Sequence, residues 1–590
     1  MLSPQTLYRM PTSLRVRLST LGMVGLNIFV VWTPALQSQS PELQKEEGYA
    51  ITHSTTVEVC SSCHSVDDQD RMTRISYLRK TPEGWQTSVR RMAALHNVNV
   101  SPEEARDIVR YLSNEQGLAP EELRPGLFEV ERRLIDHDYE GDSEVEFTCI
   151  QCHSMGRVIT QRRTREEWAL LMATHRALYP LVDGQAFRRT RAPIGRRTSA
   201  EAESEANRPD QRHPMDKAID HLSSVFPLNT PEWSAWSANK RSPQLEGSWA
   251  ISGYESGKGP IYGTATITAT DSDADAFTTS SQYVYAESGR TVERSGQALV
   301  YTGYQWRGRS NPGSSNELRE VMSIERNQRV MSGRWFSGAY DEIGPDIILK
   351  QIGAAPIITG VYPRALRRGE TTRVTIYGGG LRDTRNGAEL NFGSGVSIGT
   401  IEQSQTDELV VQLTIDADAA VGARDLFAFE STLERAIIVH DGIDRITVTP
   451  ERGMARIGGA AFPKGYQIFD AIAYSNGPDD ENGTEDDLEL GRVDVSWSLE
   501  EYAATFGDDD INFVGSIGPE DGIFTPALDG VNPDRVGDRN NIGDVWVLAT
   551  YRTREGSELR ARAHLIVTVP LYMRWEPWRT IETPRQRLIG

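Results

Sequence analysis

Two Cys-x-x-Cys-His motifs constrain this chain more than any other feature. They are Cys60-Ser-Ser-Cys63-His64 and Cys149-Ile-Gln-Cys152-His153. This spacing is the attachment signature of c-type haem, because one short turn presents two thiols to the porphyrin edge and an imidazole to the iron. A single motif could instead be a redox or zinc pair. The chain has 4 cysteines and all belong to the two motifs, so none remains for a structural disulfide.

Two covalently bound haem c groups are therefore predicted. The expected thioether residues are Cys60, Cys63, Cys149 and Cys152, and the expected proximal iron ligands are His64 and His153.

The two motifs belong to an internal repeat. Thr81-Pro-Glu-Gly-Trp85 follows the first motif, and Thr164-Arg-Glu-Glu-Trp168 follows the second. Each Thr is a good helix N-cap, with Pro82 at the first helical position in one copy and Glu167 completing a capping box in the other. Each Trp then begins the buried face of a helix. The pattern indicates a duplicated haem-binding unit.

The sixth iron ligands are predicted from the same helices. Met92 and His175 each stand seven residues after the Trp of their unit. Seven residues make about two helical turns, so each lies on the same face as its Trp. A haem in an electron-transfer protein usually has a Met or His as its sixth ligand. We therefore expect the pairs His64/Met92 and His153/His175.

Other ligands remain open at both sites. His96 lies four residues after Met92 on the same helical face and is the main alternative for the first haem. Met92 could also be a core residue, because Met is a common gap-filler. The alternatives for the second haem are Met172, His213, Met215 and His221.

The N-terminus is typical of a secretory signal. Arg9, Arg15 and Arg17 precede an apolar stretch from about residue 21 to residue 36. Residues 1–40 are therefore predicted to be a signal peptide and the protein to be periplasmic, with an uncleaved membrane anchor as the alternative.

The formal net charge of −20 argues against non-specific nucleic-acid binding, which needs a basic surface.

A chain of 590 residues is too long for one core and predicts a multidomain protein. An N-terminal α-helical diheme cytochrome c domain is expected at residues 45–226. Short alternating strands then predict three all-β domains: a barrel-like domain at 240–352, an immunoglobulin-like or TIG-like sandwich at 355–440, and a further β-sandwich at 441–575.

Three segments outside these cores carry charge or turn signals. Residues 185–212 are rich in Arg and predict an exposed loop, with a docking patch for an electron acceptor as the alternative. The segment Phe226–Trp233 is expected to be a linker. The acidic residues 478–487 could hold a hard cation but lack the spacing of a calcium loop, which favours a solvated turn.

The tandem motifs, the segment Phe226-Pro-Leu-Asn-Thr-Pro-Glu-Trp233, the three β regions and Gly543-Asp-Val-Trp-Val547 together resemble the large (α) subunit of quinohemoprotein amine dehydrogenase. The resemblance implies a β-propeller β subunit and a small γ subunit as partners. It also implies that the γ subunit carries cysteine tryptophylquinone and oxidises primary amines. No catalytic residue is then expected on the present chain.

The resemblance further implies one His/Met haem and one bis-His haem, which pass electrons to a soluble acceptor such as a cupredoxin or a cytochrome c. The Arg-rich residues 185–212 depart from the family pattern and leave the acceptor's docking surface open. Two other functions stay open: a stand-alone diheme electron carrier or diheme peroxidase, and a non-enzymatic redox sensor or adhesion protein with β interaction domains.

Overall fold

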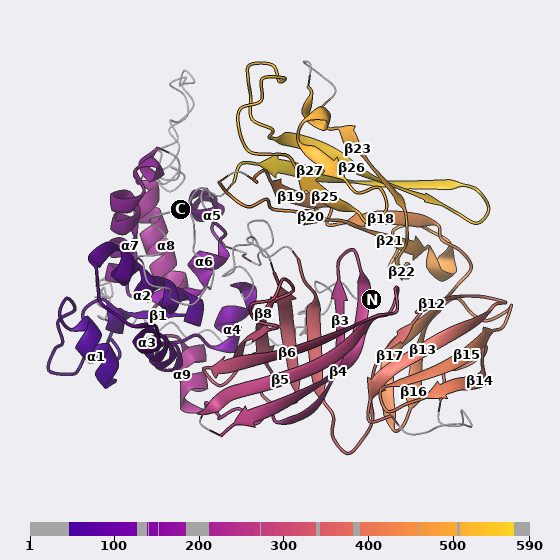
Figure 1. Cartoon of the computed structure of the whole chain (residues 1–590), viewed down its shortest axis with the longest axis horizontal. Helices are drawn as coiled ribbons and strands as arrows, with labels where there is room; N and C mark the ends of the chain where they lie inside the picture. The colour runs from indigo at the N-terminus through magenta and orange to yellow at the C-terminus, as the bar shows by residue number, and fades with distance from the viewer. Residues whose placement is uncertain are drawn as a thin grey trace, which may run out of the picture. The chain divides into compact units, whose positions relative to one another are not determined.

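The computed structural model describes residues 46–126, 139, 141–150, 153–184, 212–271, 273–337, 343–381, 390–459, 461–503 and 508–570 (Figure 1). The predicted signal peptide, Cys152 and most of the Arg-rich segment lie outside the described residues. In the described part of the chain, no helix is both long enough and apolar enough to cross a membrane.

The N-terminal region contains two equivalent sets of elements. The first set is α1 (Ser54–Cys60), β1 (Leu78–Lys80), α2 (Pro82–His96) and α3 (Pro102–Glu115). The second set is α5 (Ser143–Cys149), β2 (Gln161–Arg163), α7 (Arg165–Leu178) and α8 (Pro214–Val225). The remaining helices are α4 (Pro120–Leu123), α6 (Gly156–Ile159) and α9 (Pro231–Ala238).

The predicted caps begin the two central helices of this region. The Thr81 side chain accepts a hydrogen bond from Gly84 N at the start of α2. The Thr164 side chain accepts one from Glu167 N at the start of α7. Trp85 and Trp168 are both buried, as the repeat predicts. The segment expected to be a linker is instead helical from Pro231, because Thr230 caps α9.

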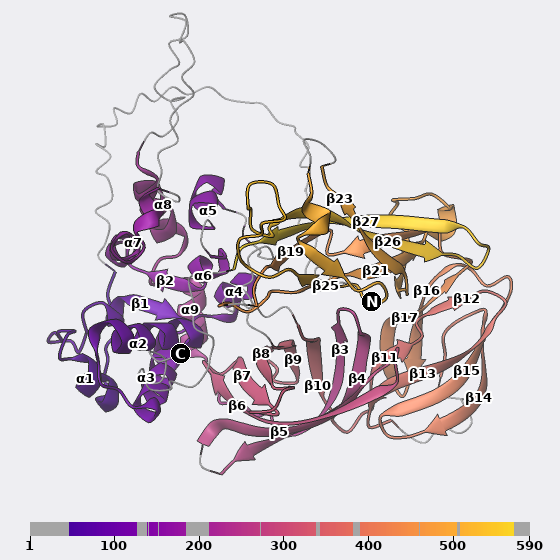
Figure 2. The same ribbon diagram turned by 45° about the horizontal axis from the view of Figure 1, so that its top comes forward.

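The two sets meet at a short antiparallel ladder between β1 and β2. Its register pairs Leu78 with Arg163, Arg79 with Arg162 and Lys80 with Gln161. Arg79 and Arg162 each stand two residues before a capping Thr, so they are equivalent in the repeat. A residue that pairs with its own equivalent marks a local twofold axis. Figure 2 shows β1 and β2 between α2 and α3 on one side and α7 and α8 on the other.

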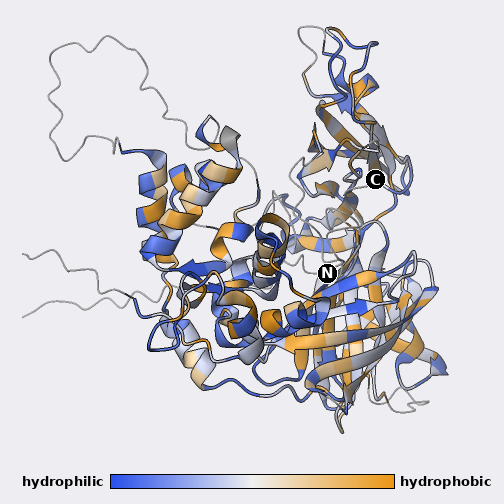
Figure 3. Cartoon of the chain, turned by 60° about the vertical axis from the view of Figure 1, so that its left-hand side comes forward, coloured by the Kyte–Doolittle hydropathy of each residue, from blue (hydrophilic) through white to orange (hydrophobic). Residues whose placement is uncertain are grey.

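An eight-stranded closed barrel follows, with strand order β10-β3-β4-β5-β6-β7-β8-β9. The prediction of a barrel is confirmed. Hydrophobic and hydrophilic residues alternate along its strands (Figure 3), and closure leaves no free sheet edge. The strands are β3 (Gly247–Glu255), β4 (Gly259–Thr270), β5 (Asp273–Tyr285), β6 (Arg290–Tyr301), β7 (Gln305–Ser310), β8 (Leu318–Ile324), β9 (Val330–Phe336) and β10 (Asp346–Gln351).

The next two regions are also built from β-sheets. A four-stranded sheet, β11-β13-β15-β14, and a three-stranded sheet, β12-β17-β16, share one hydrophobic core. These strands are β11 (Ile357–Tyr362), β12 (Ala365–Arg367), β13 (Thr371–Gly379), β14 (Val396–Ser404), β15 (Glu408–Ile415), β16 (Gly422–Ala428) and β17 (Ser431–His440).

The last region contains three sheets: β18-β21-β22, β19-β27-β26-β23 and β20-β25-β24. The strands are β18 (Arg445–Thr449), β19 (Arg452–Arg456), β20 (Gln467–Ile468), β21 (Asp470–Ser475), β22 (Leu488–Arg492), β23 (Ser496–Glu501), β24 (Gly515–Ile517), β25 (Ile523–Pro526), β26 (Gly543–Arg552) and β27 (Glu558–Thr568). The protein is therefore multidomain, with helices in its N-terminal region and mostly β structure after it.

Candidate functional site

The first Cys-x-x-Cys-His motif forms a tight turn at the end of α1. Cys60 is the last residue of this helix, and its carbonyl oxygen accepts hydrogen bonds from Cys63 N (3.2 Å) and His64 N (3.0 Å). The His64 Nδ1 donates to the Thr73 carbonyl oxygen at 2.8 Å. This bond fixes the ring and leaves Nε2 as the nitrogen that can bind a metal.

The second motif follows α5 in the same way, and Cys149 is the last residue of that helix. His153 donates its Nδ1 proton to the Ser154 carbonyl oxygen at 2.9 Å. His175, on α7, donates its Nδ1 proton to the Leu171 carbonyl oxygen at 2.8 Å. Both rings are therefore held in the tautomer whose Nε2 can act as a metal ligand.

The structure brings the two predicted ligands of the second site together. The ring centroids of His153 and His175 lie 6.4 Å apart, and the rings are tilted by 46°. Two metal–nitrogen bonds of about 2 Å each and two ring radii of about 1 Å each span about 6 Å. The observed separation therefore fits one iron held between the two imidazoles.

The pKa values of His153, His175 and two of the motif cysteines suit metal binding and not thiol redox chemistry. Burial lowers the pKa of His153 to about 4, and burial also lowers the pKa of His175, so both rings are neutral near pH 7. Burial raises the pKa of the Cys60 thiol to about 11 and that of Cys149 to about 12. A reactive Cys-x-x-Cys pair has a lowered thiol pKa, which argues against a redox dithiol here.

At the first site, the structure separates the two candidate sixth ligands by exposure. Met92 is half-buried on α2, whereas His96 is exposed at the end of that helix. Among the described residues, the rings of His64 and His96 make no contact comparable to that between His153 and His175. Exposure alone does not choose between the two, because a side chain that a porphyrin covers is also exposed in this structure, and Met92 stays the prediction of the repeat.

The alternatives at the second site have other contacts. Met172 is buried in the core of this unit, and Met215 packs against that core. The Nδ1 of His213 accepts a hydrogen bond from Met215 N at 3.1 Å and so caps α8. His221 Nε2 is hydrogen-bonded to the Tyr139 hydroxyl at 2.8 Å.

Exposed apolar side chains accompany the predicted ligands. Leu95 (53% exposed) and Leu178 (42% exposed) stand three residues after Met92 and His175, at equivalent positions of the repeat. Phe147, two residues before Cys149, is 63% exposed. Large exposed apolar groups usually mark a surface that a ligand or partner covers. Their positions and the nitrogen and sulfur ligands fit the two porphyrins that the motifs predict.

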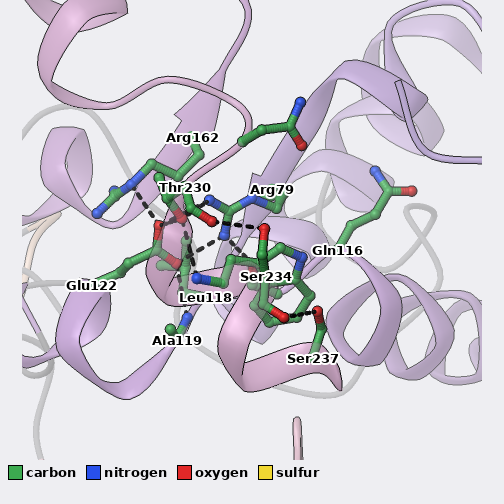
Figure 4. A network of polar contacts seen from close by, with 12 residues as sticks. Arg79, Gln116, Leu118, Ala119, Glu122, Arg162, Thr230, Ser234 and Ser237 are labelled. Atoms are coloured by element: carbon green, nitrogen blue, oxygen red, sulfur yellow. Dashed lines mark hydrogen bonds and ion pairs between the residues drawn. The ribbon is translucent and has the colours of Figure 1, made fainter. Parts of the chain in front are cut away.

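A buried ionic network joins the two units (Figure 4). Arg79 is fully buried and donates two hydrogen bonds of 2.8 Å to the Glu122 carboxylate. The Arg162 Nε lies 3.0 Å from the same carboxylate. Thr230 also donates to it at 2.8 Å. Burial alone would raise the pKa of Glu122, but the bonds and charge of Arg79 and the charge of Arg162 outweigh it and hold the pKa at about 2.

Sequence reasoning missed this network. The available signal was that Arg79-Lys80 and Arg162-Arg163 stand at equivalent positions of the repeat, directly before the two capping Thr residues. It could not show the partner, because Glu122 belongs to a third segment, and only the folded chain brings it to both arginines.

The helix that carries Met92 is also bound to the barrel. Glu83, in the first turn of α2, forms a buried ion pair with Arg307 on β7. Arg110 of α3 binds Asp273 and Asp275 at the start of β5. These pairs attach the first unit to the barrel wall.

Two acidic clusters in the last region have protein partners. The carboxylates of Asp508, Asp509 and Asp510 lie within 4.8 Å of one another, but Arg535 binds both Asp509 and Asp510. In the loop at residues 478–487, Asp487 accepts from Arg445 at 2.5 Å and from Gly483 N at 3.1 Å. Arg side chains and a backbone N–H therefore bind these carboxylates, as expected for a charged turn.

The comparison with family models covers most of the chain. Residues 52–200 match the model described as "Quinohemoprotein amine dehydrogenase A, alpha subunit, haem binding". Residues 242–351, 355–441 and 446–578 match domains II, III and IV of the same alpha subunit. No curated protein matches the chain.

Solved structures to which the chain is similar include the following three. A redesigned β-barrel is 11% identical, with 19% of this chain and 96% of that chain covered and a TM-score of 0.16. A fluorescence-activating barrel designed de novo is 18% identical, with 19% and 97% covered and a TM-score of 0.15. The Bacteroides ovatus mixed-linkage glucan protein SGBP-B, in complex with a heptasaccharide, is 11% identical, with 54% and 60% covered and a TM-score of 0.18. At these TM-scores the likeness carries no further conclusion.

Proposed function

Because this chain belongs to the family of quinohemoprotein amine dehydrogenase alpha subunits, we propose that it is the electron-transfer subunit of such an enzyme. The family is a subunit of an oxidoreductase and contains a haem-binding domain. In the proposal, this chain carries two haem c groups and relays electrons from a quinone on a partner subunit to a soluble acceptor, a cupredoxin or a cytochrome c. The amine-oxidising site lies on the partner.

The separation of the His153 and His175 rings is the observation that supports this function best. Two imidazoles with both Nδ1 atoms donating to carbonyl oxygens, 6.4 Å apart, suit a six-coordinate haem iron. Such a haem has no open position for a substrate, so electron transfer fits it better than peroxidase chemistry. We assign His64 and Met92 to the other haem and Cys60, Cys63, Cys149 and Cys152 to the thioether bonds.

Two haems suit the task of accepting electrons from a quinol. Reoxidation of a quinol releases two electrons, and each haem supplies one-electron redox chemistry when bound. A Met ligand raises the potential of a haem relative to His. Electrons then enter at the His153/His175 haem and leave from the His64/Met92 haem. A higher potential at the His153/His175 haem would reverse this order.

The remaining parts of the proposal concern location and partners. A signal peptide at residues 1–40 exports the chain to the periplasm. There it assembles with a β-propeller subunit and a small subunit that bears cysteine tryptophylquinone. The multi-subunit nature of the family supports the existence of partners.

Purification from the native periplasm tests the proposal. We expect two haems per chain by the pyridine haemochrome assay, two co-purifying subunits by mass spectrometry, and amine-dependent reduction of both haems. Replacing Cys60 and Cys63 with Ala should leave one haem per chain, and replacing Cys149 and Cys152 should leave the other. A chain that emerges alone, with two haems and no reduction by amines, would be a stand-alone electron carrier, and a high-spin haem would favour a peroxidase.

A further inference from the structure

Two buried cations occupy equivalent positions of the repeat. Lys80 directly precedes Thr81, and Arg163 directly precedes Thr164. Lys80 is 8% exposed and Arg163 is 5% exposed. The Lys80 ammonium lies 5.2 Å from the centroid of the Trp85 ring. The Arg163 guanidinium lies 5.6 Å from the centroid of the Trp168 ring. The same arrangement of a cation over a Trp therefore occurs in both haem-binding units.

Within the described residues, these two cations have less counter-charge around them than Arg79 and Arg162 have. Lys80 Nζ donates to the Ser88 hydroxyl at 2.7 Å, and Arg163 Nε donates to the Gln161 amide oxygen at 2.9 Å. In the part of the chain that the structure describes, Glu167 is the one carboxylate within ion-pair distance of either cation. It lies 3.9 Å from Arg163.

Glu167 is itself bound by a third cation. The Arg74 Nε lies 2.8 Å from its carboxylate. Arg74 and Arg163 therefore share the Glu167 carboxylate, and among the described residues Lys80 has no carboxylate within ion-pair distance. In contrast, Arg79 and Arg162, one residue earlier in each unit, both bind Glu122 (Figure 4). A buried charge without a counter-charge is costly, so this surplus calls for a further anion.

Lys80 ends β1 and Arg163 ends β2, and each strand directly precedes the helix that carries the proposed sixth ligand of its unit. The Lys80 side chain reaches Ser88 on α2, which stands one helical turn before Met92. In the repeat, Ser88 corresponds to Leu171, whose carbonyl oxygen accepts from His175. Burial is the main cause that holds the pKa of Lys80 well below its usual range, and the charges of Arg163 and Arg91 lower it further. Such a lowered pKa is the behaviour of an ammonium without a bound anion.

We propose that Lys80 and Arg163 bind the propionate carboxylates of the two haems, Lys80 in the unit of His64 and Arg163 in the unit of His153. The inference rests on the proposed haem function and deepens it. Haem propionates are anions that enter the protein with the cofactor, and carboxylates form strong charge-assisted hydrogen bonds with ammonium and guanidinium groups. Trp85 and Trp168 hold the cations in place through their ring faces.

Two variants test this proposal in the purified holoprotein. Lys80→Met and Arg163→Met keep an apolar stem over the Trp ring and remove the charge. Arg106→Met is the matched control, because Arg106 is an exposed cation on α3 of the first unit. The measurements are the haem content, the midpoint potential of each haem, and the propionate bending bands in the resonance Raman spectrum.

We expect two haems per chain in all three variants. In Lys80→Met, the propionate bands of the His64 haem shift and its potential becomes more negative, because a nearby cation disfavours the ferric state. Arg163→Met gives the same changes at the His153 haem. Arg106→Met matches the wild type in all three measurements.

Unchanged propionate bands in both variants, with two haems bound, would overturn the inference and leave the proposed function standing. A wild-type chain without haem would overturn the proposed function first. If the Met variants do not fold, Lys80→Arg and Arg163→Lys decide, since they keep the charge. A shift of the propionate bands of the haem in the same unit, with its potential near the wild-type value, supports propionate binding, because the donor to the carboxylate has changed and the charge has not. Wild-type bands in both of these variants overturn the inference.

Discussion

Arg79 pairs with Arg162 across the β1–β2 ladder, and both guanidinium groups bind one carboxylate, that of Glu122. The two arginines are equivalent in the repeat, but their surroundings differ. Pro120-Glu-Glu122 in the first unit corresponds to Pro231-Glu-Trp233 in the second, so one unit supplies a carboxylate where the other supplies Trp233. The Arg79 guanidinium lies 5.2 Å from the centroid of that Trp ring. The joint between the units is therefore symmetric in its backbone and asymmetric in its side chains.

Glu122→Gln should destabilise the protein by about 3–5 kcal/mol, because it leaves two buried guanidinium groups without a counter-charge. Chemical denaturation, monitored by the circular dichroism of the helical region, measures the change. Glu121→Gln is the matched control, since Glu121 is exposed on the same short helix. An equal loss in both variants would contradict a specific role for the Glu122 carboxylate.

The same carboxylate predicts a loss of stability in acid. The pKa of Glu122 is about 2 in the folded chain and 4.5 in its ordinary state, so the stabilisation is present above pH 4.5 and is lost as the pH falls towards 2. The loss at this group should reach about 3 kcal/mol. Denaturation midpoints between pH 6 and pH 2 measure it. Glu122→Gln should show a shallower decline than the wild type over this range, and an identical decline would refute the assignment.

The ion pair between Glu83 and Arg307 predicts a coupling between α2 and the barrel. Both side chains are buried, so Glu83→Gln or Arg307→Met alone should cost about 3–5 kcal/mol. The double variant should cost less than the sum of the two, because it leaves no unpaired charge. A double-mutant cycle by chemical denaturation gives the coupling energy. Additive effects would show that the two charges do not interact.

Met92→His tests the ligand proposed for the haem of the first unit. An imidazole in place of the thioether should lower the midpoint potential of that haem and leave the His153/His175 haem unchanged. Potentiometric titration of both haems measures this, together with the loss of the long-wavelength band that Met ligation gives. His96→Ala is the control, and we expect it to keep that band. Loss of the band in His96→Ala instead would make His96 the ligand.

Local sequence was enough to predict the elements that position the candidate ligands. The capping residues Thr81 and Thr164 act on their own helices through contacts three residues away, so a short pattern specifies them. Burial of Trp85 and Trp168 followed from their place in the repeat. The barrel was predicted from alternating strands, which is again a local signal.

The sequence by itself determined the two Cys-x-x-Cys-His motifs, the repeat around them and the helices that carry Met92 and His175, because each depends on residues close together in the chain. Only the tertiary structure showed that the two units of the repeat meet at the β1–β2 ladder and that buried charged side chains join them. The pairing of Arg79 with Arg162 and the shared carboxylate of Glu122 join segments that are far apart in sequence. Buried charged groups need partners, and folding brings those partners together from distant segments. A pattern of neighbouring residues in the sequence therefore does not reveal them.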